Sequence, residues 1–157
     1  MVATPNNSYL NAREGNDYLK GDRGNDMLVG GSGDDVLSGG KGDDLLAGEF
    51  GSDVLVGGAG RDGFYYVTVD PGSTDVITDF EAGKDFFSFD HALKNTIGPN
   101  AALSFIGSAA FSRQLGQARF ANNLLQVDLN GDASSDINVR LPGITTFDGA
   151  WLTVPTA

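Results

Sequence analysis

A nine-residue unit repeats without insertion through the first part of the chain. The unit reads Gly-Gly-x-Gly-x-Asp-x-Leu-x, and two nearly identical copies occupy residues 30–38 and 39–47. With Asp as position 6 and the aliphatic residue as position 8, the same frame extends from Gly15 to Tyr65, and a weaker unit covers residues 4–12. A period kept over this length indicates a repeat architecture in which each unit stacks on its neighbours.

The residue types within the unit predict a turn followed by a short strand. Glycine permits positive φ, so the backbone can curl and point its carbonyls inward at little steric cost. The next three residues are expected to be extended, with only the aliphatic residue at position 8 pointing inward. Two units would then make one coil of a parallel β-roll, and the inward side chains of both sheets would form a thin core.

Stacking these units would bring like charges together. Alternate units would lie in the same sheet about 4.8 Å apart, and two carboxylates about 5 Å apart repel by roughly 3 kcal/mol at an effective dielectric of 20. Carboxylates and carbonyls form the all-oxygen ligand set that suits Ca²⁺. Cysteine is absent and the single His91 lies outside the repeats, which argues against Zn²⁺ or Cu²⁺. The sequence therefore predicts that Ca²⁺ is bound by the position-6 aspartates Asp17, Asp26, Asp35, Asp44, Asp53 and Asp62.

Composition and motifs exclude several classes of protein. The chain has 21 acidic against 10 basic residues, whereas nucleic-acid binding requires clustered Lys and Arg. No apolar stretch approaches the ~18 residues of a transmembrane segment, and the first twenty residues contain no apolar core of a secretory signal peptide. No HExxH, GxSxG or paired-carboxylate motif is present, and His91 has no partner pattern. We therefore expect that the chain is not an enzyme.

The repeats resemble the RTX, or haemolysin-type, calcium-binding repeat over roughly residues 4–65. In that family each Ca²⁺ lies between the turns of units i and i+2. It is bound by both aspartates, by main-chain oxygens at positions 2 and 4 of one turn, and by those at positions 1 and 3 of the other. The ligand sets that the resemblance implies are Arg13, Gly15 and Asp17 facing Gly30, Ser32 and Asp35; Asp22, Gly24 and Asp26 facing Gly39, Lys41 and Asp44; Gly31, Gly33 and Asp35 facing Gly48, Phe50 and Asp53; and Gly40, Gly42 and Asp44 facing Gly57, Ala59 and Asp62.

Some units depart from the family pattern. Arg13, Asp22 and Glu49 replace the glycine at position 2, which keeps the carbonyl ligand but is expected to strain the turn. In the weak first unit Ser8 stands where Asp belongs, so a site that pairs Ser8 with Asp26 should bind Ca²⁺ weakly.

The residues after the repeats, 66–157, are expected to form a second unit, a β-sandwich-like cap. Residues 64–90 resemble the segment that follows the repeats in serralysin-type metalloproteases and related exported proteins, where the cap closes the open end of the roll. The resemblance implies one further Ca²⁺ bound by Asp75, Asp79 and Asp85. The alternative of equal weight is that these carboxylates belong to turns and strand edges.

The last part of the chain is expected to contain short strands joined by hairpin turns. Asn122-Asn123 and Asn130-Gly131 have the residue types of such turns. The segment from Asp128 to Asp136 superficially resembles an EF-hand loop, but it lacks the Gly and the bidentate Glu that such a loop needs. We therefore interpret it as a hairpin turn.

The resemblance implies a calcium-responsive module of a secreted, extracellular protein. In the family such a C-terminal domain carries a secretion signal near its end, leaves the cell unfolded through the type I secretion machinery, and folds outside. Extracellular Ca²⁺ sites have dissociation constants of about 10⁻⁴–10⁻³ M, so the cytosol would leave them unfilled. Without ions, repulsion between the aspartates opposes folding, and thin leucine ladders do not offset the chain entropy.

Two alternative functions remain. One is a glycan-binding module, similar to the RTX modules of mannuronan epimerases that assist alginate binding, with an extracellular polysaccharide as partner. The other is the tail of a protease or lipase whose catalytic domain lies elsewhere. A glycan-binding groove would be favoured by basic residues, but position 5 holds Asn16, Asn25, Asp34, Asp43, Ser52 and Arg61.

Overall fold

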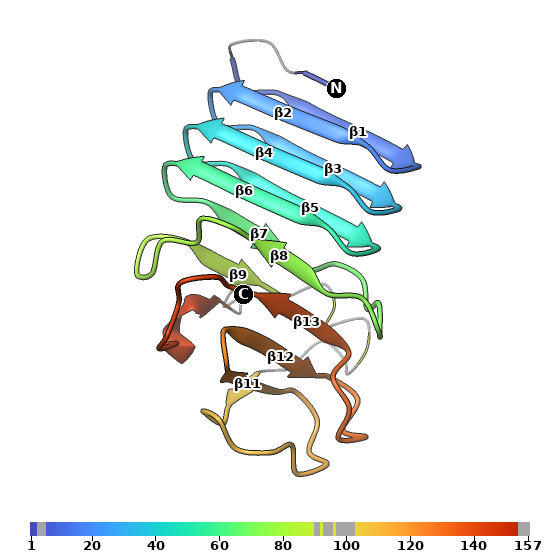
Figure 1. Cartoon of the computed structure of the whole chain (residues 1–157), viewed down its shortest axis with the longest axis vertical. Coiled ribbons are helices and arrows are strands. Elements are labelled where there is room, and N and C mark those ends of the chain that lie inside the picture. The colour runs from blue at the N-terminus through green and yellow to red at the C-terminus, as the bar shows by residue number, and fades with distance from the viewer. Residues whose placement is uncertain (3–5, 90–91, 93–95, 97–102, 154–157) are drawn as a thin grey trace.

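A computed structural model describes residues 1–2, 6–89, 92, 96 and 103–153, which form two β-sheets with little helix (Figure 1). The strands of the repeats pair in parallel, each with the strand two units away. Within the repeats, one sheet contains the odd-numbered strands and the other the even-numbered ones, which confirms the predicted parallel β-roll. These strands are β1 (Tyr9–Glu14), β2 (Tyr18–Arg23), β3 (Met27–Ser32), β4 (Val36–Lys41), β5 (Leu45–Phe50), β6 (Val54–Ala59) and β7 (Gly63–Tyr65).

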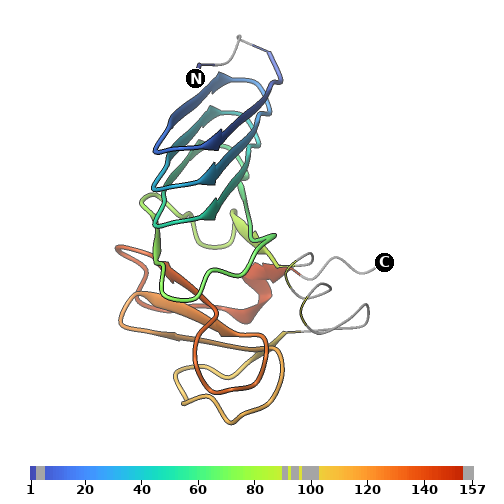
Figure 2. The same ribbon diagram turned by 90° about the vertical axis from the view of Figure 1, so that its right-hand side faces the viewer.

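The position-8 side chains fill the space between the two sheets. Leu10 pairs with Leu28, and Leu19 with Leu37, so the same register recurs from coil to coil. The position-8 side chains with 0–1% exposure are Leu19, Leu28, Leu37, Leu46, Leu55 and Phe64. Their burial confirms the inward direction predicted for position 8. Figure 2 shows the coils stacked one above the next.

The strands after the repeats extend the two sheets of the roll (Figure 1). β8 continues from β6, and β9 continues from β7, so both sheets cross the boundary expected at residue 65. The C-terminal end of the roll is thereby paired, as a cap requires. The remaining elements are β8 (Asp75–Ile77), β9 (Phe86–Ser88), β10 (Ser104–Phe105), β11 (Gln117–Ala121), β12 (Leu124–Asp128), β13 (Ile137–Arg140), the short 3₁₀ helix η1 (Gly149–Trp151) and β14 (Leu152–Thr153).

The core changes from aliphatic to aromatic where the cap begins. Phe64 pairs with Phe87 across β7 and β9, and the Phe87 ring stacks on Phe80 with 4.9 Å between centroids. Phe147 packs against Phe87 from the C-terminal part of the chain, at 6.0 Å. These large rings join the cap to the last coil, so the thin leucine ladder ends on a wider packed core.

Both predicted hairpin turns are present. Asn122 and Asn123 join β11 to β12 with φ of 54° and 62°, the left-handed values of a type I′ turn. The loop from Asp128 to Asp136 joins the antiparallel strands β12 and β13, and both of these carboxylates accept main-chain N–H groups within the loop. The hairpin interpretation of this loop is therefore confirmed. His91, for which we expect no catalytic role, lies outside the described residues.

The strain expected at position 2 is confirmed. Arg13, Asp22 and Glu49 have φ of 82°, 79° and 76°, in the left-handed region where a side chain costs roughly 1–2 kcal/mol. The turn imposes this conformation because glycines at the same position in other units also have positive φ, for example Gly31 at 114°.

Replacing Glu49 by Gly should therefore stabilise the folded chain by about 1 kcal/mol in saturating Ca²⁺, because glycine adopts this φ without the Cβ penalty. Urea unfolding of the two proteins measures the difference. The matched control is Glu14→Gly, at an exposed strand residue outside the positive-φ set, which should destabilise by about 0.5–1 kcal/mol. Equal effects of the two substitutions would contradict the strain.

Candidate metal centre

The position-6 aspartates form two columns along the turns of the roll. The first column contains Asp17, Asp35 and Asp53, and the second contains Asp26, Asp44 and Asp62. In each column an Asp Oδ1 accepts the main-chain N–H of the Asp one coil closer to the N-terminus, at 2.7–3.0 Å. We call these bonds the aspartate ladder. They fix one oxygen of Asp35, Asp44, Asp53 and Asp62, and the N–H of Ser8 fixes the equivalent oxygen of Asp26. The other oxygen of each of these carboxylates is left without a partner in the ladder.

In five of these six aspartates the second carboxylate oxygen is buried without a hydrogen-bond partner. The residues concerned are 0–2% exposed, and their orphaned atoms are Oδ2 of Asp26, Asp35, Asp44, Asp53 and Asp62. Buried polar atoms are nearly always paired, and an unpaired buried carboxylate oxygen is costly. Five such atoms at equivalent positions indicate a bound group that completes them.

Main-chain carbonyl oxygens lie beside the same position-1 glycines as these unpaired carboxylate oxygens. A Cβ built at Gly39 would overlap Asp44 Oδ2 and lie 2.7 Å from Gly57 O, and Gly30 stands in the same relation to Asp35 Oδ2 and Gly48 O. The carboxylate of one turn and the position-1 carbonyl of the facing turn therefore converge beside a residue that has no side chain. This convergence explains the glycine at position 1.

The other predicted carbonyls lie in the same gaps between facing turns. In the first set, the carbonyls of Arg13 and Gly15 approach positions 2 and 4 of the facing turn, at Gly31 and Gly33. The carbonyl of Ser32 accepts the N–H of Gly15 at 2.8 Å and keeps its second lone pair. The position-3 carbonyls of the other sets accept in the same way, at 2.8–2.9 Å: those of Lys41, Phe50 and Ala59.

This donor set fits Ca²⁺. Among the described residues no three His, Cys, Asp or Glu side chains converge on one point, so an ion here requires carbonyl ligands beside the carboxylates. Two aspartates and several carbonyls supply the six to eight hard oxygens that Ca²⁺ takes. The ligand sets themselves stay predictions.

Burial raises the pKa of four of these carboxylic acids, Asp35, Asp44, Asp53 and Asp62. It is the main cause that brings the pKa of Asp44 to about 6 and that of Asp53 to about 7, and the charges of stacked neighbours add to it. A raised pKa in the folded chain means that the Ca²⁺-free fold binds more protons than the unfolded chain between about pH 4 and 7. Its stability therefore falls as pH rises through this window.

Acidification should consequently weaken Ca²⁺ binding while it favours the Ca²⁺-free fold. Between pH 7.5 and pH 5.5 we expect the affinity of the folded chain for Ca²⁺ to fall by roughly tenfold, because each ion must displace protons from the buried carboxyls. The Ca²⁺ concentration at half-folding should not rise, because the unfolded chain has already lost these protons. Over the same range the chelator-treated chain should gain β-structure. Circular dichroism in chelator at the two pH values measures this gain, and a spectrum in chelator that is independent of pH would contradict the buried, protonated carboxyls.

Asp75 is the last aspartate of the first column, and Asp85 is the last aspartate of the second. Asp75 Oδ1 accepts the N–H of Asp53, and Asp85 Oδ1 accepts the N–H of Asp62, both at 3.0 Å. Asp79 continues neither column: its two oxygens accept the N–H groups of Gly57 and Gly58, and its charge acts on Asp62. The structure therefore does not bring Asp75, Asp79 and Asp85 together into the single three-carboxylate site that the resemblance implies.

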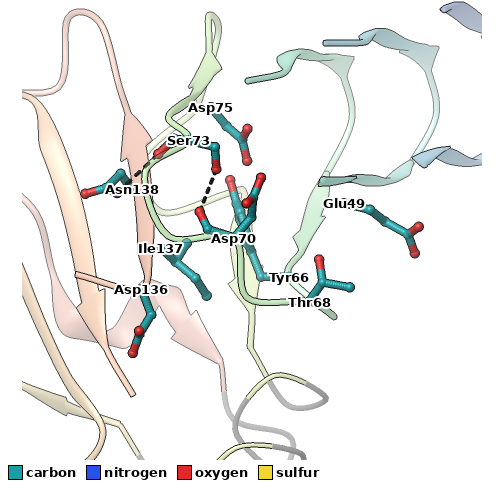
Figure 3. A pocket seen from close by; sticks show the side chains of 9 residues that line it. All are labelled: Glu49, Tyr66, Thr68, Asp70, Ser73, Asp75, Asp136, Ile137 and Asn138. Atoms are coloured by element: carbon teal, nitrogen blue, oxygen red, sulfur yellow. Dashed lines mark hydrogen bonds between the residues drawn. The ribbon is translucent and has the colours of Figure 1, made fainter. Parts of the chain in front are cut away.

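A polar cavity marks the end of the first column (Figure 3). Tyr66, Asp70, Ser73 and Asp75 face one another there, whereas the Glu49 carboxylate points away from them. Asp70 Oδ2 accepts the N–H of Gly51 from the roll, at 2.8 Å. This hydrogen bond joins the roll to the segment that contains Asp75. Burial raises the pKa of Asp75 to about 6.

Among the comparisons with known proteins, a family profile identifies the repeats. The sequence profile of the RTX calcium-binding nonapeptide repeat, in four copies, matches residues 2–37 and 29–64. A solved structure, the AlgE6R3 subunit of the mannuronan C5-epimerase from Azotobacter vinelandii, is 17% identical and has a TM-score of 0.43. The match covers 96% of this chain and 80% of that one, and the score is too low to support a functional inference. No curated protein matches significantly.

Sequence reasoning missed the hydrogen-bonding role of the position-6 oxygens. The repeat predicts where each Asp lies, but the N–H that its Oδ1 accepts belongs to another unit, 18 residues earlier in the chain. It also missed the ends of the columns, where this separation becomes 22 residues for Asp75 and 23 for Asp85. The only sequence signal for these column ends is that an Asp follows each segment in which the nine-residue spacing is lost.

Proposed function

Because residues 2–64 of this chain are RTX calcium-binding nonapeptide repeats, we propose that the chain is a module of an exported protein that folds when it binds Ca²⁺. The observation that carries the proposal is the set of five orphaned Oδ2 atoms in two columns. The Oδ2 atoms of Asp26, Asp35 and Asp44 lie where a carbonyl of the facing turn also points. A bound cation would satisfy these oxygens and neutralise the repulsion within each column.

Binding would be linked to folding because each site is shared by two coils. In the unfolded chain the facing turns are separated by 18 residues of flexible sequence, so the ligands converge only in the roll. An ion that binds the folded form alone stabilises it by mass action. Extracellular sites of this charge type bind at about 10⁻⁴–10⁻³ M, above cytosolic Ca²⁺. The chain would therefore stay unfolded in the cell.

This behaviour suits a protein that leaves the cell unfolded through the type I secretion machinery. RTX repeats are typical of extracellular proteins, and among the described residues no helix is long and apolar enough to cross a membrane. Outside the cell, Ca²⁺ would fold the module and help whatever segment precedes it to fold. A role of this kind needs no catalytic residue, and we propose that the module is not itself an enzyme.

Ion counting tests the binding step directly. Chelator-treated chain should bind about four Ca²⁺ in equilibrium dialysis, one for each predicted pair of facing turns, in the presence of millimolar Mg²⁺. Mg²⁺ should compete poorly because it demands a compact octahedron and dehydrates reluctantly. Binding of one ion or none would contradict the proposal, and so would equal uptake of Mg²⁺.

A further inference from the structure

The structure contains a second ladder, outside the aspartate ladder and formed by position 5. In the second column Asn7 Oδ1 accepts the N–H of Asn25, and Asn25 Oδ1 accepts the N–H of Asp43, at 2.9 and 3.0 Å. Asp43 Oδ1 then accepts the N–H of Arg61 at 2.8 Å. In each bond a position-5 side chain holds the position-5 N–H of the next coil. We call this series the outer ladder.

The first column repeats the pattern with different residue types. Asn16 Oδ1 accepts from Asp34 N at 3.0 Å, and Asp34 Oδ1 accepts from Ser52 N at 2.9 Å. Ser52 Oγ accepts from Thr74 N, the residue before Asp75, at 3.3 Å. An amide, a carboxylate and a hydroxyl therefore serve equally, and the shared requirement is a short side chain with an acceptor oxygen.

The one position-5 residue without such an oxygen is found where the ladder needs none. Arg61 is the last position-5 residue of the second column, and its guanidinium lies over the Phe86 ring at 4.6 Å. The residue that would follow it in the column, Lys84, donates its N–H to the carbonyl of Glu81 instead. A side chain without an acceptor oxygen is therefore found at the position where no N–H of a following coil has to be bonded.

The two ladders run in opposite directions through adjacent amides. The N–H of Asp43 bonds to the preceding coil through Asn25, while the N–H of Asp44 bonds to the following coil through Asp62. Each turn is therefore held from both neighbours at two consecutive residues. A shift of one turn against the next would break both bonds and move the carbonyls away from Oδ2.

From this arrangement we infer that position-5 side chains are positioning residues of the Ca²⁺ sites. Their acceptor oxygens align facing turns so that carboxylate and carbonyl oxygens converge. The inference rests on the proposed Ca²⁺ binding and deepens it, because it assigns the site geometry to residues that touch no ion. It also defines which residues position 5 accepts in a Ca²⁺-loaded coil: Asn, Asp, Ser or another short acceptor.

The test replaces Asn25 by Leu, which has a similar size but no acceptor. In the Ca²⁺-loaded chain the Asp43 amide should exchange its hydrogen at least about fivefold faster, as expected for the loss of one hydrogen bond. When Ca²⁺ is withdrawn by a fluorescent chelator, an early phase should appear that releases the ion between the turns of Asp26 and Asp44. Release of the remaining ions should keep the wild-type rate.

Three matched variants complete the test. Asn25→Asp keeps an acceptor and should restore both readouts to wild-type values. Arg61→Leu makes the same kind of change where no acceptor is needed and should leave the release phases unchanged. Ser52→Ala removes an acceptor from the first column and should expose the Thr74 amide, which keeps the inference testable if Asn25→Leu does not fold.

The outcomes separate the inference from the function on which it rests. Wild-type release kinetics in both Asn25→Leu and Ser52→Ala would overturn the inference while leaving Ca²⁺ binding intact. Uniform acceleration of every ion would also overturn it, because the side chain would then support overall stability and not one site. A wild-type chain that binds no Ca²⁺ would overturn the proposed function and the inference with it.

Discussion

Replacing Asp44 by Asn should have opposite effects on the Ca²⁺-loaded and the Ca²⁺-free chain. Asn keeps the Oδ1 acceptor for the N–H of Asp26 but removes a charged ligand that the family pattern places in two sites. We therefore expect the loaded chain to lose on the order of 2–4 kcal/mol of unfolding free energy. The Ca²⁺-free fold should gain stability, because the buried charge disappears and the new amide can donate to the Gly57 carbonyl.

Urea unfolding in saturating Ca²⁺ and in chelator measures the two effects. The matched control is Asp43→Asn, the exposed neighbour that keeps its acceptor in the outer ladder. It should change either free energy by less than about 0.5 kcal/mol. If Asp44→Asn destabilised both forms equally, its carboxylate would be a structural hydrogen-bond acceptor and not a metal ligand.

Leu46→Ala should produce the second large effect, through the core and not through the ligands. Leu46 is fully buried in β5, in register with Leu28 and Phe64 in the neighbouring strands. Removing its side chain leaves a cavity in a core only two side chains thick, and we expect a loss of about 3 kcal/mol. The Ca²⁺ concentration needed for folding should rise accordingly, since the ions must offset this loss.

The adjacent residue provides the control for this substitution. Leu45 is on the same strand but faces outward and is half-buried. Leu45→Ala should cost less than about 1 kcal/mol, and the Ca²⁺ concentration at half-folding should stay close to that of the wild type. Similar losses for Leu45→Ala and Leu46→Ala in saturating Ca²⁺ would contradict the inward and outward assignment of positions 8 and 7.

Much of the roll could be predicted because one unit determines its own contacts. A period of nine residues places Leu28 opposite Leu46 once the strands are taken as parallel, and no distant part of the chain is needed. The same period predicts that Asp26 and Asp44 are neighbours in a column, which the structure confirms. The positive φ at Glu49 followed from its place in the unit.

The period alone did not predict burial on the outer face. Val29 and Ala47 occupy position 9, which should point outward, yet they are only 6% and 5% exposed. They pair with each other in the middle of a sheet with a coil on either side, so neighbouring side chains cover these small residues. Alternation along a strand predicts direction, whereas exposure also depends on the size of the neighbours.

The cap was less predictable because its contacts join segments far apart in sequence. Strand β13 pairs with β8, and β14 pairs with β9, over more than sixty residues in each case. No period relates these segments, so their pairing cannot be derived from local pattern. The placement of Asp75 and Asp85 at the ends of different columns follows from this pairing and from the loops before each strand.

The measurement that tests the account most directly is far-UV circular dichroism of the whole chelator-treated chain during a Ca²⁺ titration, with Mg²⁺ as control. The account predicts a largely disordered spectrum in chelator and a cooperative change to β-structure at about 10⁻⁴–10⁻³ M Ca²⁺, without a corresponding change in Mg²⁺. A β spectrum already complete in chelator at neutral pH would contradict it, because the roll would then fold without ions to neutralise its aspartates.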